Sequence, residues 1–298
     1  MGSLIVDFYV RVPREPRDGE TLVVQDAGLY AGGKGLNQAV GVRRLGAKVY
    51  VIGRVGDDVF GKFLRAAIRR EGLPVDGIAV DDQVPTGTAL PIAGPDHHYI
   101  LHVPGANQAL RTEEVSAQLE RQTDAKMILL QGEVNREVNL VAALWAKEHG
   151  CMVVLDPAPT EAISEDLLLL ADYVTPNLVE LAQLTGSDPA RNVSEAIFQT
   201  DGLFARHSQL TAVMATLGPW GAYVASRQGH FHLEARHVLA QDTTAAGDAF
   251  NAALAVTLAE EGGTIRQAAE HGVLAGTYAC QISGALPSIP ARNDLAEW

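Results

Sequence analysis

The sequence is poor in cysteine, in basic residues and in long apolar runs. Its two cysteines, Cys151 and Cys280, lie in apolar stretches, which favours reduced core thiols in a cytosolic protein over a disulfide framework. Lys and Arg number 23 against 36 Asp and Glu, a formal net charge of −13. This excess argues against a nucleic-acid partner and against attraction to an anionic membrane. No apolar run approaches the roughly 18–20 residues of a membrane span.

What is present is the composition of an ordinary globular protein. The 298 residues are 47% hydrophobic and 20% charged, without repeats or low-complexity segments, so residues 1–298 are expected to form one large α/β domain. The opening "MGSLIVDFYV" lacks the basic region of a secretory signal peptide. A cytoplasmic location is therefore expected.

Apolar strands alternate with helices along most of the chain. Strands are expected over 47–56, 127–134, 151–159, 173–177 and 211–218, and helices near 60–71, 136–149, 178–186, 246–261 and 264–283. This alternation predicts a mostly parallel sheet covered on both faces by helices. Two turn-rich segments, about 8–33 and 86–107, have instead the pattern of antiparallel hairpins. We expect them to form a lid over a crevice at the carboxyl ends of the strands.

The stretch "LYAGGKGLNQAV" (29–40) has the glycines and lysine of a phosphate-binding loop but not its spacing. Lys34 is followed by Gly35, so no hydroxyl is placed to reach Mg²⁺, and the dinucleotide pattern G-x-G-x-x-G is also absent. Gly32 and Gly33 would still let backbone approach a ligand closely, with a cation at Lys34 and amides at 37 and 38. A tight turn between lid and helix explains the same residues equally well.

A second stretch, "QDTTAAGDAFNAAL" (241–254), places small residues before a long apolar helix. The N–H groups of Ala245, Ala246 and Gly247 would form an anion site at the helix N-terminus. Asp248, in the first turn, would be placed to take a proton from an alcohol. The alternative is that Asp248 only stabilises the helix dipole.

Together the two stretches resemble the ribokinase-like (PfkB) carbohydrate kinases. The resemblance extends in order over almost the whole chain, through "TGTA" (86–89), "PGAN" (104–107), "LLQGEV" (129–134), "DPAP" (156–159), "TPNLVEL" (175–181), "TLGPWG" (216–221) and "GALPSIP" (284–290). It implies a three-layer α/β/α fold with a small β-sheet lid often used for dimerisation. It also implies ATP-dependent phosphorylation of a sugar hydroxyl, with Mg²⁺ and usually K⁺, and a homodimer whose other partners are small molecules.

The resemblance also implies a role for each matching residue. Asp248 would be the catalytic base beside the anion hole of residues 245–247, and Asp242 would help to hold the monovalent cation. Glu180 would bind Mg²⁺ through water. The implied sugar contacts are Asp7, Gly32, Gly33, Lys34, Asn37 and Glu133, and the implied nucleotide contacts are Asn177, Glu180, Thr216, Gly218 and Gly221. Simpler alternatives are a solvated strand end for Glu133 and a helix cap for Asn177 with Glu180.

Two departures from the family pattern bear on the substrate and on the first strand. Ile5 stands where ribokinases usually carry an asparagine two residues before the sugar-binding Asp7. The expected substrate is a pentose, with ribose as the first candidate, although Ile5 also favours deoxyribose. Fructose or a nucleoside as the substrate stays open, and so does a catalytically silent sugar-binding role. Family members usually have five or six strand residues before "GSLIVD". We therefore expect a shortened first strand and a native start upstream, so that an extended chain would be more stable or more active.

Overall fold

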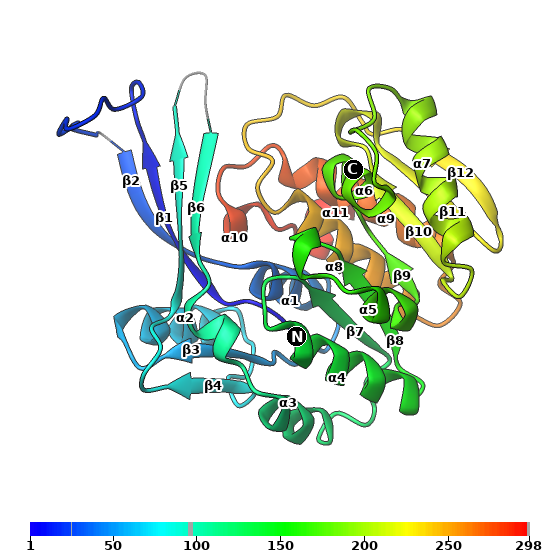
Figure 1. The fold of residues 1–298 in the computed structure, drawn as a ribbon, viewed down its shortest axis with the longest axis horizontal. Coiled ribbons are helices and arrows are strands. Elements are labelled where there is room, and N and C mark those ends of the chain that lie inside the picture. Colours follow the sequence, from blue (N-terminus) through cyan, green and yellow to red (C-terminus); the bar gives the residue numbers. More distant parts are fainter. Residues whose placement is uncertain (25, 95–97, 297–298) are drawn as a thin grey trace.

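A six-stranded sheet forms the centre of the larger part of the molecule. The computed structural model describes residues 1–24, 26–94 and 98–296 (Figure 1). In spatial order the strands of this sheet are β12 (Gly229–Leu233), β11 (Ala222–Ser226), β10 (Ala212–Thr216), β9 (Tyr173–Val174), β8 (Met152–Asp156) and β7 (Met127–Gln131). Its strands β7 to β10 pair in parallel, whereas β11 pairs antiparallel with both β10 and β12, which confirms the mostly parallel sheet.

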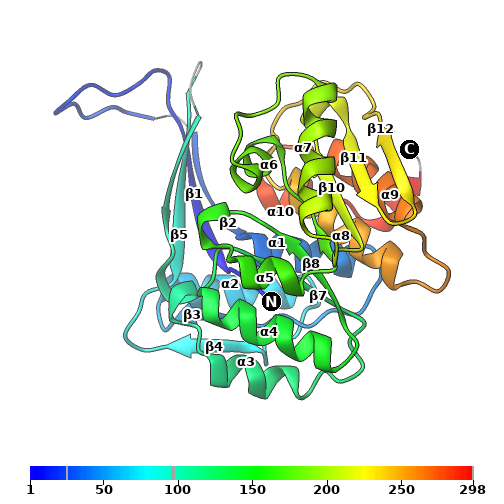
Figure 2. The same ribbon diagram turned by 45° about the vertical axis from the view of Figure 1, so that its right-hand side comes forward.

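Helices cover both faces of this sheet, as the sequence pattern predicts (Figures 1 and 2). One face carries α3 (Thr112–Leu119), α4 (Arg136–Glu148), α5 (Glu165–Leu170), α6 (Leu178–Thr185) and α7 (Val193–Arg206). The other carries α1 (Lys34–Arg44), α8 (Ala246–Ala259) and α9 (Ile265–Ala279), and the short α10 (Ala285–Ser288) and α11 (Arg292–Ala296) follow them. The three-layer expectation is therefore confirmed.

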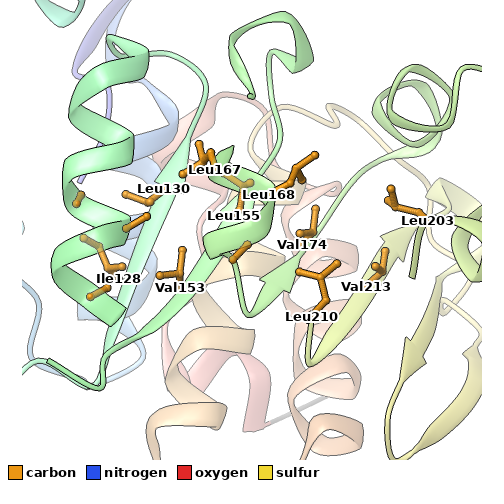
Figure 3. Close-up of a cluster of buried hydrophobic side chains, with 14 of the residues drawn as sticks. Ile128, Leu130, Val153, Leu155, Leu167, Leu168, Val174, Leu203, Leu210 and Val213 are labelled. Atoms are coloured by element: carbon orange, nitrogen blue, oxygen red, sulfur yellow. The ribbon is translucent and has the colours of Figure 1, made fainter. Parts of the chain in front are cut away.

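The strands are apolar on both faces because both faces are covered. Ile128 and Leu130 of β7 lie in the core under α4, together with Leu155 of β8 (Figure 3). The intervening Leu129 and Val154 pack on the opposite side. Side chains of successive residues point to opposite faces of a strand, so a continuous apolar run fills two cores at once.

The two predicted hairpins combine into one small sheet. Its order is β2 (Asp26–Gly32), β1 (Ile5–Arg11), β5 (Gly87–Ala93) and β6 (His98–Val103). The outer pairs are antiparallel, and β1 and β5 in the middle are parallel. We call this four-stranded sheet the lid sheet. Figures 1 and 2 show it projecting from the body beside α1 and α10.

The central sheet is interrupted near the start of the chain. Strands β3 (Gly53–Gly56) and β4 (Ile78–Asp81), flanked by α2 (Val59–Arg70), form a separate parallel pair. Residues 1–4 form no strand: the Met1 amino group donates to Leu129 O at 3.0 Å and Gly2 N to Ile52 O at 3.1 Å. A cavity of about 830 Å³ lies here, lined by Ile52 on one side and Leu129 on the other. The expected strand 47–56 begins only at residue 53, because no strand in the described part of the chain lies alongside residues 47–52 to pair with them.

The described part of the chain contains no helix that combines the length and the apolarity that a membrane crossing requires. Cys151 is buried, Cys280 is half-buried, and both are free thiols.

Candidate active site

The turn between the lid sheet and α1 brings the chain close to β1 with almost no space to spare. Gly33 has φ 92°, and a Cβ on it would lie 2.9 Å from Ser3 O. At Gly32 a Cβ would lie 2.3 Å from Asp7 Oδ2. Gly33 is thus required by its φ and by the backbone beside it, whereas a side chain at Gly32 would displace the Asp7 carboxylate. The prediction of a tight turn is therefore correct for the backbone. The turn places residues 34–38 at the carboxyl ends of the strands.

Asp248 is buried at the start of α8 and held by two neighbouring amides of α1. Asn37 Nδ2 donates to Asp248 Oδ2 at 2.9 Å, and Gln38 Nε2 donates to Asp248 Oδ1 at 3.0 Å. The helices approach closely, since a Cβ on Gly41 would lie 2.5 Å from the Ala252 Cβ. Burial raises the pKa of Asp248 to about 6, and the two amides and Lys34 limit the rise. A carboxylate that stays ionised at neutral pH yet is this basic suits a general base.

Lys34 is surrounded by carboxylates. Its Nζ lies 3.2 Å from Asp156 Oδ2, and Asp156 is buried at the end of β8. Burial disfavours the lysine charge, but Asp156, and then Asp248, Glu133 and Glu180, raise the pKa of Lys34. Lys34 therefore stays protonated and offsets part of the negative charge of the site.

Asp7 and Glu133 form the acidic end of the cluster next to the lid sheet. Glu133 Oε2 accepts hydrogen bonds from the Ser3 hydroxyl and from Lys34 N at 3.1 Å. Burial, then the charges of Glu133 and Asp248, raise the pKa of Asp7 to about 7. Glu133 is half-buried and bonded, so the alternative of a solvated strand end is wrong.

Asn177 and Glu180 cap α6. Asn177 Oδ1 accepts from Glu180 N at 3.0 Å, and Glu180 Oε2 accepts from Asn177 N at 2.8 Å, a reciprocal capping box. The helix-cap interpretation is therefore correct for the local structure. The charged cluster also acts on Glu180, because burial, and then the charge of Asp156, raises the pKa of Glu180 to about 7.

Thr216, Gly218 and Gly221 lie together at the end of β10. Thr216 N donates to Pro176 O at 2.9 Å, next to Asn177, so the β10 end is joined to the α6 cap. Gly218 is exposed with φ 58°, and Gly221 has φ 91° with Leu233 O only 1.9 Å from an added Cβ. The turn thus presents open backbone on one side and is packed on the other.

The loop before α8 ends in a strained residue. Ala245 has φ 61°, unusual for a residue with a Cβ, and ends the turn in which Ala246 N donates to Thr243 O. Gly247 is exposed, with nothing within 4 Å of an added Cβ. Asp242 fixes the loop by accepting from Thr244 N at 2.9 Å and from Gly284 N at 2.8 Å.

The structure thus brings Asp7, Lys34, Asn37, Glu133 and Asp248 into one charged cluster, which Glu180 joins from α6. The nucleotide candidates form a second group around the α6 cap. Two buried residues of the cluster were not among the sequence candidates: Gln38, whose amide was noted in the glycine stretch, and Asp156, whose "DPAP" carried no assigned role. A pattern in the sequence could not identify Gln38 and Asp156, because their role depends on which helices and strands become neighbours in the fold.

Comparisons with known proteins agree with this arrangement. The model of the pfkB family carbohydrate kinases matches residues 1–292. A ribokinase of Haemophilus influenzae is 36% identical over 304 residues, covering 100% of this chain and 96% of its own. The structure of Arabidopsis thaliana ribokinase complexed with ribose and ATP is 30% identical with a TM-score of 0.87, covering 99% and 96% of the chains. A deoxyribokinase of Salmonella typhi is 28% identical over 305 residues, covering 100% and 97%.

Proposed function

Because the chain belongs to the pfkB family of carbohydrate kinases and is an ATP-dependent sugar kinase, we propose that it phosphorylates the primary hydroxyl of a pentose. Ribose is the first candidate, with ribose 5-phosphate as product. The observation that carries the proposal is Asp248, buried at the N-terminus of α8 and held by Asn37 and Gln38. This arrangement gives a fixed base beside a helix N-terminus, as attack of an alcohol on a phosphoryl group requires.

In the proposed reaction Asp248 takes the proton of the sugar hydroxyl as the oxygen attacks the γ-phosphorus in line, and the bond from that phosphorus to the bridging oxygen breaks so that ADP leaves. The N–H groups of Ala245 and Gly247 would face the charge that grows on the phosphoryl oxygens, and Ala246 N, which donates to Thr243 O at 3.2 Å in this turn, would join them by sharing its hydrogen. Gly247 suits this role because it is exposed and carries no side chain to obstruct the approach.

The sugar itself would lie between the lid sheet and α1. Asn37 Oδ1 is buried and has no hydrogen-bond partner among the described residues, so a sugar hydroxyl would satisfy it. Asp7, Glu133 and Lys34 offer further polar contacts, and Gly32 and Gly33 let the sugar approach the backbone. A ligand that fills these positions would replace its hydration with fixed partners.

Mg²⁺ would enter with ATP. The described residues contain no group of three or more His, Cys, Asp or Glu side chains that could hold a metal ion. Phosphate oxygens and waters would supply most of its ligands, with Glu180 bound through water and Asn177 beside the phosphates. Thr216, Gly218 and Gly221 would contact the nucleotide. Asp242, whose carboxylate fixes the loop before α8 through Thr244 and Gly284, would help to hold a monovalent cation such as K⁺, which would add positive charge near residues 245–247.

The lid sheet has an apolar outer face that fits a second copy of the chain. Phe8 and Leu29 are paired across β1 and β2 and are 47% and 46% exposed, and Leu101 of β6 is 58% exposed. We propose a cytoplasmic homodimer formed through this face, in which the lid sheet also covers the sugar. Light scattering checks it: Leu101→Glu should give monomers where the unchanged chain gives dimers.

Deoxyribose is the second candidate because of where Ile5 lies. Ile5 is 3% exposed and shares a face of the chain with Ser3 and Asp7, both of which belong to the acidic cluster. Its neighbours Leu4 and Val6 point instead into the core. An apolar side chain between two polar ones favours a sugar that lacks a hydroxyl at that position.

Initial rates of ATP consumption over ribose, 2-deoxyribose, fructose and nucleosides test the proposal. We expect a pentose to have the highest kcat/KM, and a nucleoside preference would overturn this. Ile5→Asn should raise the ribose to deoxyribose ratio of kcat/KM about 10-fold or more. Sugar binding without turnover of any acceptor would instead support the silent binding protein.

A further inference from the structure

Gln38 is held in a single orientation by three hydrogen bonds. Its Nε2 donates to Asp248 Oδ1 and to Asp156 Oδ2, each at 3.0 Å, and its Oε1 accepts from Gln131 Nε2 at 2.6 Å. The side chain is 2% exposed. Turning the amide over would point its oxygen at two carboxylates, so the nitrogen must face Asp248.

Asn37 binds the other oxygen of the same carboxylate in a different way. It donates once, to Asp248 Oδ2, while its own Oδ1 has no partner among the described residues. Asn37 thus has unused capacity on the sugar side and can exchange partners there. Gln38 has both of its N–H donors engaged with carboxylates, and it lines the cavity behind the site instead.

From this contrast we propose that Gln38 is a positioning residue that fixes Asp248 Oδ1, so that Oδ2, on the Asn37 side, receives the sugar proton. The inference rests on the proposed role of Asp248 as the base. A carboxylate bound at one oxygen by a rigid amide keeps its second oxygen at a constant distance from the hydroxyl, and misplacement of about 1 Å is enough to slow such a step about 100-fold.

The Gln38 amide also lies between two buried carboxylates, those of Asp248 and Asp156. Asp248 and Asp156 share the Gln38 nitrogen, and Lys34 neutralises Asp156 from the other side at 3.2 Å. The other charged groups that act on this region are Asp7 from β1, Glu133 after β7 and Glu180 from α6. Without the amide, Asp248 would lose one donor to its ionised form and would protonate at higher pH.

Gln38→Met tests the inference because methionine keeps the length of the side chain and removes the donor. We expect kcat to fall about 10- to 100-fold, with the sugar KM changed less than about threefold. The acid limb of the kcat–pH profile should move upward by about one pH unit. A role in folding alone would lower the melting temperature and leave the acid limb in place.

Gln131→Met is the matched control, since it removes the bond to Gln38 Oε1 and leaves both donors to the carboxylates. Its kcat should stay within about threefold and its acid limb should not move. If Gln38→Met does not fold, Gln38→Asn, whose amide is too short to reach Asp248, should give the same shift and loss. A folded Gln38 variant with kcat within twofold and an unmoved acid limb overturns the inference, whereas turnover that survives Asp248→Asn overturns the proposed function itself.

Discussion

The proposed sugar half of the site (the charged cluster with Asn37 and Asp248) and its proposed nucleotide half (the α6 cap and the turn after β10) differ in burial and in hydrogen bonding. In the sugar half, Asn37 and Asp248 are both 4% exposed and bonded to each other across two helices. In the nucleotide half, Asn177 and Gly218 are exposed, and the polar groups there serve a helix cap and a turn. One half holds charges that are already in place, and the other offers backbone and caps to which a ligand must bring its own charge.

This difference suggests that the two halves can be changed separately. Buried ionised groups cost free energy when their partners are removed, so substitutions in the sugar half should affect stability and chemistry together. Substitutions of Asn177 or Gly218 in the proposed nucleotide half remove exposed groups and should affect ATP binding with little change in folding.

Asp248→Asn should give the largest effect, because it removes the base and keeps the shape. We expect kcat to fall about 1,000-fold, within the range that general base catalysis contributes, while calorimetry shows sugar affinity within about threefold. The exposed Asp57 provides a control, and Asp57→Asn should leave both quantities unchanged. A residual kcat above about a tenth of normal would mean that another group takes the proton.

Lys34→Met should cost the most stability. It leaves Asp156, whose side chain is 5% exposed, without its cation, and breaking such a buried pair costs about 3 kcal/mol or more in the free energy of unfolding. The loss should shrink toward acidic pH as Asp156 becomes protonated. Lys62→Met removes an exposed pair with Asp57 and should cost less than about 0.5 kcal/mol. Equal losses in denaturant titrations of the two variants would contradict the idea of a charged, preorganised sugar half.

Asp7→Asn, in the same half of the site, should raise stability at pH 8 and lower sugar affinity. The folded protein raises the pKa of Asp7 from 3.8 to about 7, so its stabilising effect is complete below pH 3.8 and is lost as the pH rises through about 7. At pH 8 the variant should be more stable by roughly 2 kcal/mol, about half the value of the full shift because Asp7 is partly exposed. At pH 4 the gain should vanish, and sugar affinity should fall at both values. A variant less stable than the parent at pH 8 would show that Asp7 is better paired than its surroundings indicate.

The sequence predicted most of the fold and singled out several residues that the structure gathers into one cluster, whose roles stay predictions, and its failures have physical causes. Asp248 could be found because a carboxylate after small residues at a helix start is a local pattern. Gln38 could not be assigned, because its role depends on the carboxylates of Asp156 and Asp248, which lie 118 and 210 positions away. The strand expected from residue 47 begins only at residue 53, since pairing depends on a neighbouring strand and not on the apolar run itself. The roles of Asn177, Glu180 and Asp242 toward ATP and cations stay predictions.

Glu180→Gln should have the smallest effect and is the sharpest test of the nucleotide half. Glutamine can also close the capping box with Asn177, so at pH 4, where Glu180 with its pKa raised to about 7 is already protonated in the folded protein, the free energy of unfolding should change by less than about 0.5 kcal/mol. The charge beside the phosphates is nevertheless lost, and we expect the KM for ATP to rise about 5- to 10-fold and the Mg²⁺ requirement to increase. The sugar KM should stay within about twofold, because the interaction of Glu180 with the charged cluster is electrostatic. Glu180→Ala, which also breaks the cap, should add a stability loss of about 1 kcal/mol with no further rise in the KM for ATP. If the two variants differ in that KM as much as in stability, the cap positions the nucleotide and the two halves are not independent.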